Sequence, residues 1–380
     1  MSAAPVGVLT AGSRDVARGP HLTVDLAAIA ANTRLFATRA TGDLMAVVKA
    51  DGFGHGAAAV ARTALANGAS SLGVTSLQEA LSLRDLGLSA PLLSWLNPVD
   101  TDFATAVRRG VDLAVPGIEH LDRIALAAGL TGTAARIHLH LDTGMARDGA
   151  ALSDWPRLCK AVQRAERRGL VQVVGVMGHL GCADDAWDPC NDRGRATFAR
   201  GLHIAQAVGL DPQQRHLAAT SATLLDPRTH YDLCRVGAGL VGIDLSRSAD
   251  LRQPMTLTAP VVSVRSVEAG TQVGYGHTFT TTRPTTLALL PLGYADGIPR
   301  AVSGASVLLA GQRRPVVGRI SMDQIVVDAG PAPVSAGDVA VVFGPGDHGE
   351  PTVTEWAQWA STIEHEVVAG LGPRITRSYV

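Results

Sequence analysis

Short apolar runs alternate with segments of helical period through the first two thirds of the chain, and this alternation most constrains the fold. Strands separated by helices predict a parallel sheet, and about eight such units predict a (β/α)8 TIM barrel. We therefore expect an α/β barrel over residues 20–250. Its expected strands are residues 44–48, 71–75, 90–95, 111–115, 135–141, 171–177, 215–219 and 240–243.

The pattern changes after Pro254, where Val-, Thr- and Leu-rich runs are separated by Gly and Pro instead of helices. This predicts a mainly-β domain over residues 251–380. Within it we expect a helix over residues 354–363 with Thr354 as N-cap, followed by an irregular tail. Its expected strands are residues 260–267, 285–290, 307–309 and 324–327.

Composition limits the possible partners. Lys and Arg together number 33 and Asp and Glu 34, which gives no basic surface for nucleic acid or an anionic membrane and favours a small-molecule partner. Residues 1–19 lack a continuous apolar core, so we interpret them as a disordered lead and not as a signal peptide or a membrane span. The cysteines form no CxxC pair, which argues against a disulfide framework or a zinc ribbon and fits a reducing cytoplasm; they are Cys159, Cys182, Cys190 and Cys234.

The strongest local motif is Ala-Val-Val-Lys-Ala-Asp-Gly-Phe-Gly-His-Gly at residues 46–56. Lys49 closes an apolar strand, and a glycine-rich turn follows it. Barrel enzymes build their active sites at the C-terminal ends of strands, and burial there lowers the pKa of a lysine so that its free amine can form a Schiff base. From this segment alone, a surface lysine beside a flexible turn is the alternative.

This motif resembles the cofactor-lysine motif of the alanine racemase family. Further segments resemble that family in the same order along the chain, at residues 141–147, 178–179, 219–223, 235–237, 273–278, 292–297 and 318–324. The resemblance, to an actinobacterial-like member, implies an N-terminal barrel that binds pyridoxal 5′-phosphate (PLP) and a C-terminal β domain. It also implies a cytoplasmic homodimer with shared active sites, a small amino-acid substrate and no metal.

The resemblance assigns cofactor roles residue by residue. Lys49 corresponds to the PLP lysine, Ser221 with the backbone of Gly237 and Ala238 to the phosphate site, and Arg235 to the partner of the pyridine nitrogen. A guanidinium only donates, so the ring nitrogen stays unprotonated, a weaker electron sink that disfavours transamination. A salt-bridge role is the alternative for Arg235, and ordinary loop residues are the alternative for the others.

Racemisation needs one base on each face of the planar intermediate. The resemblance implies interconversion of L- and D-alanine through a PLP external aldimine, with Lys49 on the D-face and Tyr275 of the partner subunit on the L-face. His179 would help to polarise the phenol. As a strand-edge aromatic, Tyr275 would instead be structural.

The remaining roles concern the substrate. Arg147 would bind the substrate carboxylate and the cofactor's phenolic oxygen, while Met322 and Tyr294 from the partner subunit would complete the pocket. Trp95 lies where the family often has an aliphatic residue near the ring, and a core role is equally open for it.

Four departures from the family pattern affect cofactor and gate positions. His140 replaces a lysine that many members carbamylate to hold the arginine, so Arg147 must be restrained otherwise. Phe53 replaces the motif tyrosine, Thr220 an asparagine, and His365 a late tyrosine that reaches the phosphate. PLP affinity, rate and substrate choice therefore depend on this chain's own residues.

Three alternatives stay open. A racemase for serine or another small amino acid, in specialised metabolism or inhibitor self-resistance, shares all of these motifs. An aldolase or dehydratase on the same barrel is disfavoured, because no cysteine accompanies the late His348 or His365, and a decarboxylase is disfavoured because all four cysteines lie before Pro254. A non-catalytic PLP-binding protein is disfavoured because the chain keeps the domain with Tyr275.

Overall fold

The computed structural model describes residues 19–380, so the expected disordered lead lies, apart from Gly19, outside the described residues. The chain divides into two compact units, residues 26–252 and residues 253–380 together with the segment up to Asp25. None of the helices within the described part is long and apolar enough to cross a membrane.

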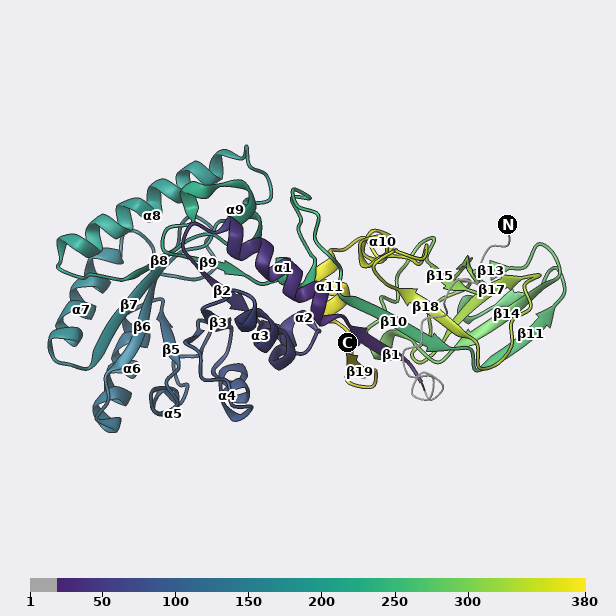
Figure 1. The fold of residues 1–380 in the computed structure, drawn as a ribbon, viewed down its shortest axis with the longest axis horizontal. Coiled ribbons are helices and arrows are strands. Elements are labelled where there is room, and N and C mark those ends of the chain that lie inside the picture. Colours follow the sequence, from purple (N-terminus) through teal and green to yellow (C-terminus); the bar gives the residue numbers. More distant parts are fainter. Residues whose placement is uncertain (1–18) are drawn as a thin grey trace, which may run out of the picture. The chain divides into compact units, whose positions relative to one another are not determined.

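The unit of residues 26–252 confirms the predicted barrel (Figure 1). Its eight strands are parallel and follow the order β8-β7-β6-β5-β4-β3-β2-β9. Backbone hydrogen bonds from Asp232 N to Arg215 O and from Arg235 N to Ala218 O, both 3.0 Å, connect the two ends of this order. The strands are β2 (Asp43–Val47), β3 (Ser71–Val74), β4 (Leu92–Ser94), β5 (Asp112–Val115), β6 (Ala135–His140), β7 (Val171–Met177), β8 (Gln214–His216) and β9 (Leu233–Val236).

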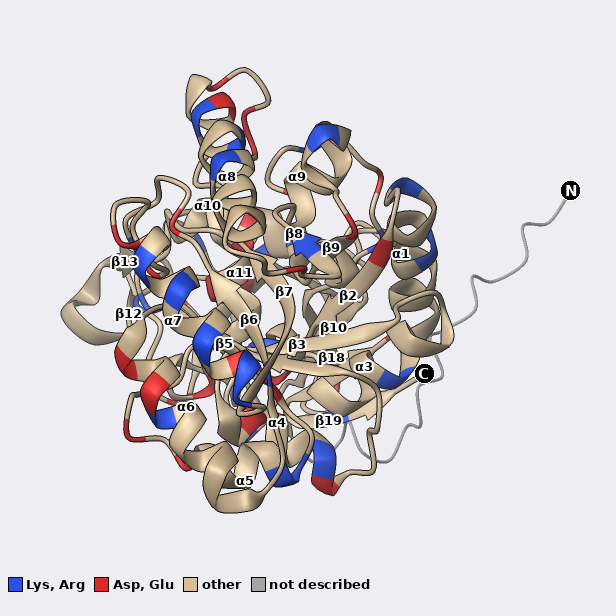
Figure 2. Cartoon of the chain, turned by 90° about the vertical axis from the view of Figure 1, so that its left-hand side faces the viewer, with Lys and Arg blue, Asp and Glu red and all other residues tan. Residues whose placement is uncertain are grey.

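Helices surround this sheet and leave its carboxyl edge to loops. Figure 2 shows acidic and basic residues interspersed on the helices of the face in view, without a patch of one sign. The helices are α1 (Leu26–Arg39), α2 (Lys49–Phe53), α3 (Ala57–Ala66), α4 (Leu77–Asp85), α5 (Phe103–Arg108), α6 (Ile118–Thr131), α7 (Trp155–Arg167), α8 (Pro189–Ala207) and α9 (Thr220–Leu225).

The barrel differs from the sequence prediction at its last strand. Residues 240–243 were expected as a strand, but Ala238–Val241 form a 3-10 helix, and the strand is Leu233–Val236. Gly239 explains the difference: a Cβ there would lie 2.3 Å from Cζ of Phe36, so the backbone approaches α1 too closely for a strand with side chains. Asn32 of α1 also donates to the carbonyl oxygen of Leu240.

Residues 253–380 form the predicted mainly-β unit (Figure 1). A six-stranded sheet has the order β16-β15-β18-β10-β1-β19, and a three-stranded sheet has the order β11-β14-β17. The strands are β10 (Met255–Pro260), β11 (Ser263–Val267), β12 (Gln272–Val273), β13 (Phe279–Thr280), β14 (Thr285–Leu290), β15 (Ser306–Leu309), β16 (Gln312–Pro315), β17 (Ile325–Gly330), β18 (Val339–Phe343) and β19 (Thr376–Tyr379).

Strand β1 (His21–Val24) belongs to this six-stranded sheet, where it pairs antiparallel with β10 and parallel with β19. The expected barrel boundary at residue 20 therefore moves to Leu26. The reason is pairing on both edges together with burial of one face: β10 and β19 flank the strand, and Leu22 and Val24, which share one face, are fully buried.

The helical end of this unit corrects two further expectations. Helix α10 (Val353–Trp359) begins after Thr352, not Thr354, because Thr352 accepts from Glu355 N while the Glu355 carboxylate accepts from Thr352 N. The expected irregular tail contains helix α11 (Glu364–Ala369) and strand β19.

Candidate active site

Lys49 lies two residues after the end of β2, at the carboxyl edge of the barrel, and is the first residue of α2. The next five residues, Ala50 to Gly54, all have left-handed backbone, with φ from 51° to 78°. Such backbone costs about 1–2 kcal/mol for each non-glycine residue, so other contacts must hold it. The Glu79 carboxylate accepts from Ala50 N at 2.7 Å, and Asp51 accepts from Ala57 N at 2.8 Å.

The surroundings of Lys49 favour its free amine. Burial lowers the pKa of Lys49, the Arg147 guanidinium lowers it further, and Glu79 opposes them. A neutral amine is nucleophilic and can take a proton, so the position and the pKa both suit a reacting group.

Arg235 projects from β9 and is 5% exposed. Its two terminal nitrogens donate to the carbonyl oxygens of His216 and Gly178, each at 2.7 Å. Burial lowers the pKa of Arg235 to about 10, which still leaves the guanidinium charged at neutral pH. His179 lies 3.4 Å from the same guanidinium.

His179 is neutral in this setting. Burial lowers its pKa to about 3, and the positive charges of Arg235, Arg147 and Lys49 contribute in that order. The Thr143 hydroxyl donates to the carbonyl oxygen of His179 at 2.6 Å, which joins this residue to the loop after β6.

Three buried side chains inside the barrel continue from Arg235, and the sequence analysis missed them. Nη1 of Arg235 lies 3.0 Å from Nδ1 of His216, and Nε2 of His216 lies 2.9 Å from Nδ1 of His138. Nε2 of His138 lies 3.5 Å from a carboxylate oxygen of Asp112, which Arg136 binds at 2.7 and 3.1 Å.

The series of hydrogen bonds from Arg235 to Asp112 fixes the tautomers of both imidazoles. The Asp112 carboxylate only accepts, so His138 carries its proton on Nε2 and accepts from His216 through Nδ1. Nδ1 of His216 then accepts from Arg235. Burial raises the pKa of Asp112, but hydrogen bonds from His138 and Arg136 outweigh it and hold the pKa below its usual value.

Local packing makes room for His138. A Cβ on Gly175 of β7 would lie 2.5 Å from Nδ1 of His138, so only glycine fits there. The register between β6 and β7 also shifts at His138, which pairs with Gly175 while Ile137 pairs with Val173. A signal was present in the sequence: two histidines alternate with apolar residues in Ile-His-Leu-His-Leu at 137–141.

The loop after β6 carries Arg147. Oδ1 of Asp142 accepts from the backbone N–H groups of Gly144, Met145 and Ala146, which fixes this loop. Within residues 19–380, the exposed Arg147 guanidinium makes no hydrogen bond or ion pair and lines a pocket with His140 and His179. It is therefore available to an anionic ligand.

His140 contacts Asp148, with Nδ1 3.4 Å from a carboxylate oxygen, and within residues 19–380 it forms no hydrogen bond with Arg147. Burial raises the pKa of Asp148, but His140 outweighs it and lowers the pKa overall.

Two loops bring the expected phosphate residues together. Ser221 follows the first residue of α9, Gly237 lies between β9 and the 3-10 helix, and Ala238 is the first residue of that helix. Oγ1 of Thr220 accepts from Gly239 N at 3.2 Å and links these loops. A Cβ on Gly237 would lie 2.8 Å from the ring of Phe53, so the backbone at Gly237 lies against that ring.

Trp95 packs on a buried cluster inside the barrel, formed by Met45, Leu93, Ala114, Met177 and Leu233. A Cβ on Gly73 would lie 2.7 Å from Cζ3 of Trp95. Both interpretations of Trp95, at the core and near a ring, fit this position.

The other unit gathers Tyr275, Tyr294 and Met322, which are 72%, 38% and 53% exposed. Backbone hydrogen bonds from Tyr294 N to Ser321 O and from Ala295 N to Met322 O join two of their loops. A Cβ on Gly276 would lie 3.3 Å from the Arg319 guanidinium, so the Tyr275 turn lies against the same 318–322 segment. His365, in α11, is partly buried in this unit.

Each of the two units matches a known domain family. The N-terminal domain of alanine racemases matches residues 24–244, and the C-terminal domain of alanine racemases matches residues 254–379. The chain belongs to the alanine racemase family. The family assignment predicted from the motifs is therefore confirmed.

Relatives in this family are similar over nearly the whole chain. The alanine racemase of Salinispora arenicola is 46% identical over 94% of this chain and 98% of its own length, and that of Thermobifida fusca is 44% identical over 94% and 96%. The crystal structure of alanine racemase from D-cycloserine-producing Streptomyces lavendulae has a TM-score of 0.93 at 42% identity, over 95% of this chain and 97% of its own.

Proposed function

We propose that this chain is a PLP-dependent alanine racemase that interconverts L- and D-alanine. The observation that carries the proposal is Lys49, an amine with a lowered pKa at the carboxyl edge of the barrel, among Arg147, His179 and Arg235. The substrate comes from the family, whose relatives are named alanine racemases.

The residues present fit PLP. Lys49 would hold its aldehyde carbon, and Ser221 with the backbone of Gly237 and Ala238 would hold its phosphate. The close approach of the Phe53 ring to Gly237 supports this assignment, because it excludes side chains from the phosphate loop. When bound, PLP withdraws electrons from the substrate Cα and makes its proton acidic.

Arg235 would face the pyridine nitrogen of PLP and donate to it. Its pKa of about 10 keeps it charged. The hydrogen-bonded side chains of His216, His138 and Asp112 hold its orientation. Since a guanidinium cannot give up its proton near neutral pH, the ring nitrogen stays unprotonated.

Lys49 and Tyr275 would be the two bases. Lys49 moves the Cα proton on the D-face, and Tyr275 of a partner subunit moves it on the L-face. The exposure of Tyr275, Tyr294 and Met322 on one unit supports delivery to a partner's site, since large exposed apolar side chains of this kind mark an interface. We therefore propose a homodimer.

Arg147 would bind the substrate carboxylate, because its guanidinium is free and lines the pocket beside His179. His365 would reach the cofactor phosphate in place of the family tyrosine, and Trp95 would lie near the ring. The free thiols suit a reducing compartment, so we place the enzyme in the cytoplasm.

The experiment is incubation of PLP-loaded enzyme with single L-amino acids in D2O, following chirality and deuterium at Cα. We expect alanine to racemise with deuterium incorporation and to exceed serine and larger amino acids in kcat/KM. A preference for serine would show that serine, and not alanine, is the substrate. An absence of exchange with every amino acid would overturn the proposed enzymatic function.

A further inference from the structure

Three metal-ligand side chains meet where the loop after β7 enters the first turn of α8, and none of them lines the pocket described above. The sulfur atoms of Cys182 and Cys190 and a carboxylate oxygen of Asp188 all lie within 4.8 Å of one another. No other group of at least three His, Cys, Asp or Glu with such spacing occurs in the described part of the chain. The sequence analysis expected no metal, because the cysteines form no CxxC pair and the family resemblance implies none.

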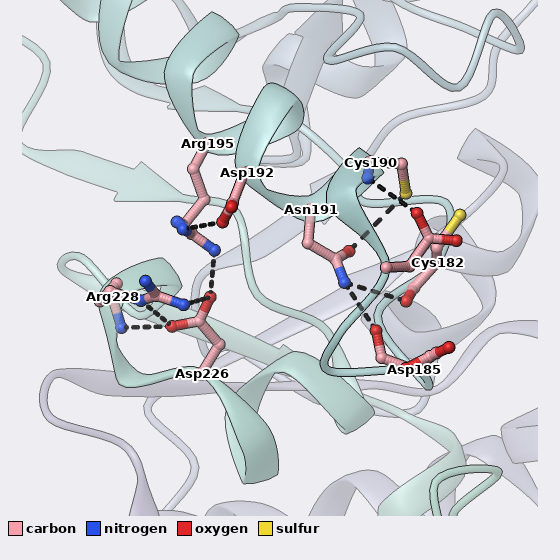
Figure 3. Close-up of polar contacts among 9 residues, drawn as sticks. Cys182, Asp185, Cys190, Asn191, Asp192, Arg195, Asp226 and Arg228 are labelled. Carbon is pink, nitrogen blue, oxygen red and sulfur yellow. Dashed lines mark hydrogen bonds and ion pairs between the residues drawn. The ribbon is translucent and has the colours of Figure 1, made fainter.

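The loop is held in this shape by hydrogen bonds to its own backbone (Figure 3). Nδ2 of Asn191 donates to the carbonyl oxygens of Cys182 and Asp185, at 3.1 and 2.8 Å. Oδ1 of Asp188 accepts from Cys190 N at 2.8 Å and caps α8. The three ligand atoms are therefore brought together by contacts that do not need an ion.

We propose that Cys182, Asp188 and Cys190 bind a thiophilic divalent cation of the Zn²⁺ class. Two thiolates and one carboxylate are a ligand set for Zn²⁺, and bond lengths of about 2.0–2.3 Å place tetrahedral ligands roughly 3.5–3.8 Å apart. Since the three atoms lie within 4.8 Å of one another, binding needs each pair to move closer by at most about 1 Å. All three side chains are partly exposed, so water completes the fourth position.

The charges of the cluster favour a cation over a disulfide. A carboxylate beside two sulfurs adds nothing to a disulfide, whereas it supplies a third ligand and neutralises a metal. A metal ion displaces the thiol protons on binding.

The bound cation would tie residues 182–190 into one closed loop. This loop starts three residues after His179, so the ion stabilises the segment that leaves the pocket. Its role is structural, and the site does not depend on the proposed racemase activity.

The test uses untagged PLP-loaded protein, reduced and freed of metal. Equilibrium dialysis with Zn²⁺ is expected to give about one ion per chain, and Cd²⁺ is expected to give the ultraviolet charge-transfer band of thiolate ligands. Cys182→Ser and Cys190→Ser should each remove that band, and Asp188→Asn, which keeps the capping oxygen, should weaken binding about tenfold.

Two variants serve as matched controls. Asp184→Asn removes the same charge from an exposed position on the same loop, and Cys159→Ser removes a buried thiol on α7. Both should bind like the parent. Less than stoichiometric binding overturns the proposal, as does binding that the three ligand variants leave unchanged. A Cys182–Cys190 disulfide that forms in air, with no metal uptake after reduction, would identify the pair as a redox couple instead.

Discussion

Nε2 of His216 and Nδ1 of His138 lie 2.9 Å apart, with their rings nearly perpendicular at 83°. This bond connects Arg235, near the carboxyl edge of the barrel, to Asp112, the first residue of β5. The amino ends of barrel strands usually serve stability, so a carboxylate there that orients a group at the carboxyl edge is a long-range positioning contact.

Replacing His138 tests this contact. His138→Leu leaves the buried Nε2–H of His216 without an acceptor. We therefore expect the free energy of unfolding to fall by about 1–3 kcal/mol and kcat to fall as well. His138→Gln keeps an acceptor toward His216 and a donor toward Asp112, and should retain most of both. Urea denaturation measures the free energy of unfolding, and alanine turnover measures kcat. If the Leu and Gln variants lose equal amounts of both, the hydrogen bonds of His138 contribute nothing beyond the packing of its side chain.

Lys49 and Lys160 are the only lysines in the chain, which makes the cofactor attachment easy to assign. Borohydride reduction of the PLP-loaded enzyme should fix the cofactor on the peptide with Lys49, because burial favours its free amine. Lys160 is exposed on α7, and Lys160→Arg should label like the parent. Label on Lys160 after peptide mapping would contradict the assignment.

Tyr275→Phe removes the proposed L-face base but keeps the ring. We expect racemisation to fall about 100- to 10,000-fold in both directions, because turnover crosses both faces. Deuterium exchange from D-alanine through Lys49 should survive in part. Tyr379→Phe, a change at another exposed tyrosine of the same unit, is the control. Equal loss of exchange from both enantiomers argues against separate faces.

Arg147→Lys should raise KM for alanine about tenfold or more, because an ammonium loses the bidentate contact with a carboxylate. Arg167→Lys, on the exposed face of α7, should leave KM unchanged. Steady-state kinetics in both directions provide the measurement, and an unchanged KM would place the carboxylate elsewhere.

His216 links stability to pH. Burial, then Arg235 and His138, lower its pKa well below the usual value, so the folded protein does not take up a proton that the unfolded chain binds below about pH 6.5. Stability should therefore fall as pH falls below about 6.5, by about 1.4 kcal/mol per pH unit for this histidine. His216→Gln should make the decline shallower in urea titrations, whereas His203→Gln, on the surface of α8, should not.

Periodicity predicted seven of the barrel strands near their observed positions, since a buried parallel strand is a short apolar run. It misplaced the eighth because residues 240–243 are apolar for another reason, contact with α1. It also placed β1 in the barrel unit. A four-residue strand carries no information about partners more than 230 residues away, such as β10 and β19.

The sequence likewise revealed some residues of the candidate site and missed others. Lys49 and Arg147 follow strand ends or lie in loops, where side-chain type and position point to chemistry, and Arg235, inside β9, was found only through the family motif. His138, His216 and Asp112 lie within or at the start of buried strands, where a single polar residue looks like an ordinary core residue until its partners on other strands are known. Their hydrogen bonds, and the meeting of Cys182 with Cys190, exist only in three dimensions.

The position of β1 between β10 and β19 imposes an order on biosynthesis. The ribosome makes residues 21–24 first and residues 376–379 last, yet these strands are neighbours in one sheet. The barrel of residues 26–252 is complete in sequence while β1 still waits for both partners. The apolar side chains of Leu22 and Val24 therefore lack their sheet until β10 has been made, and the other edge of β1 stays open until β19 follows.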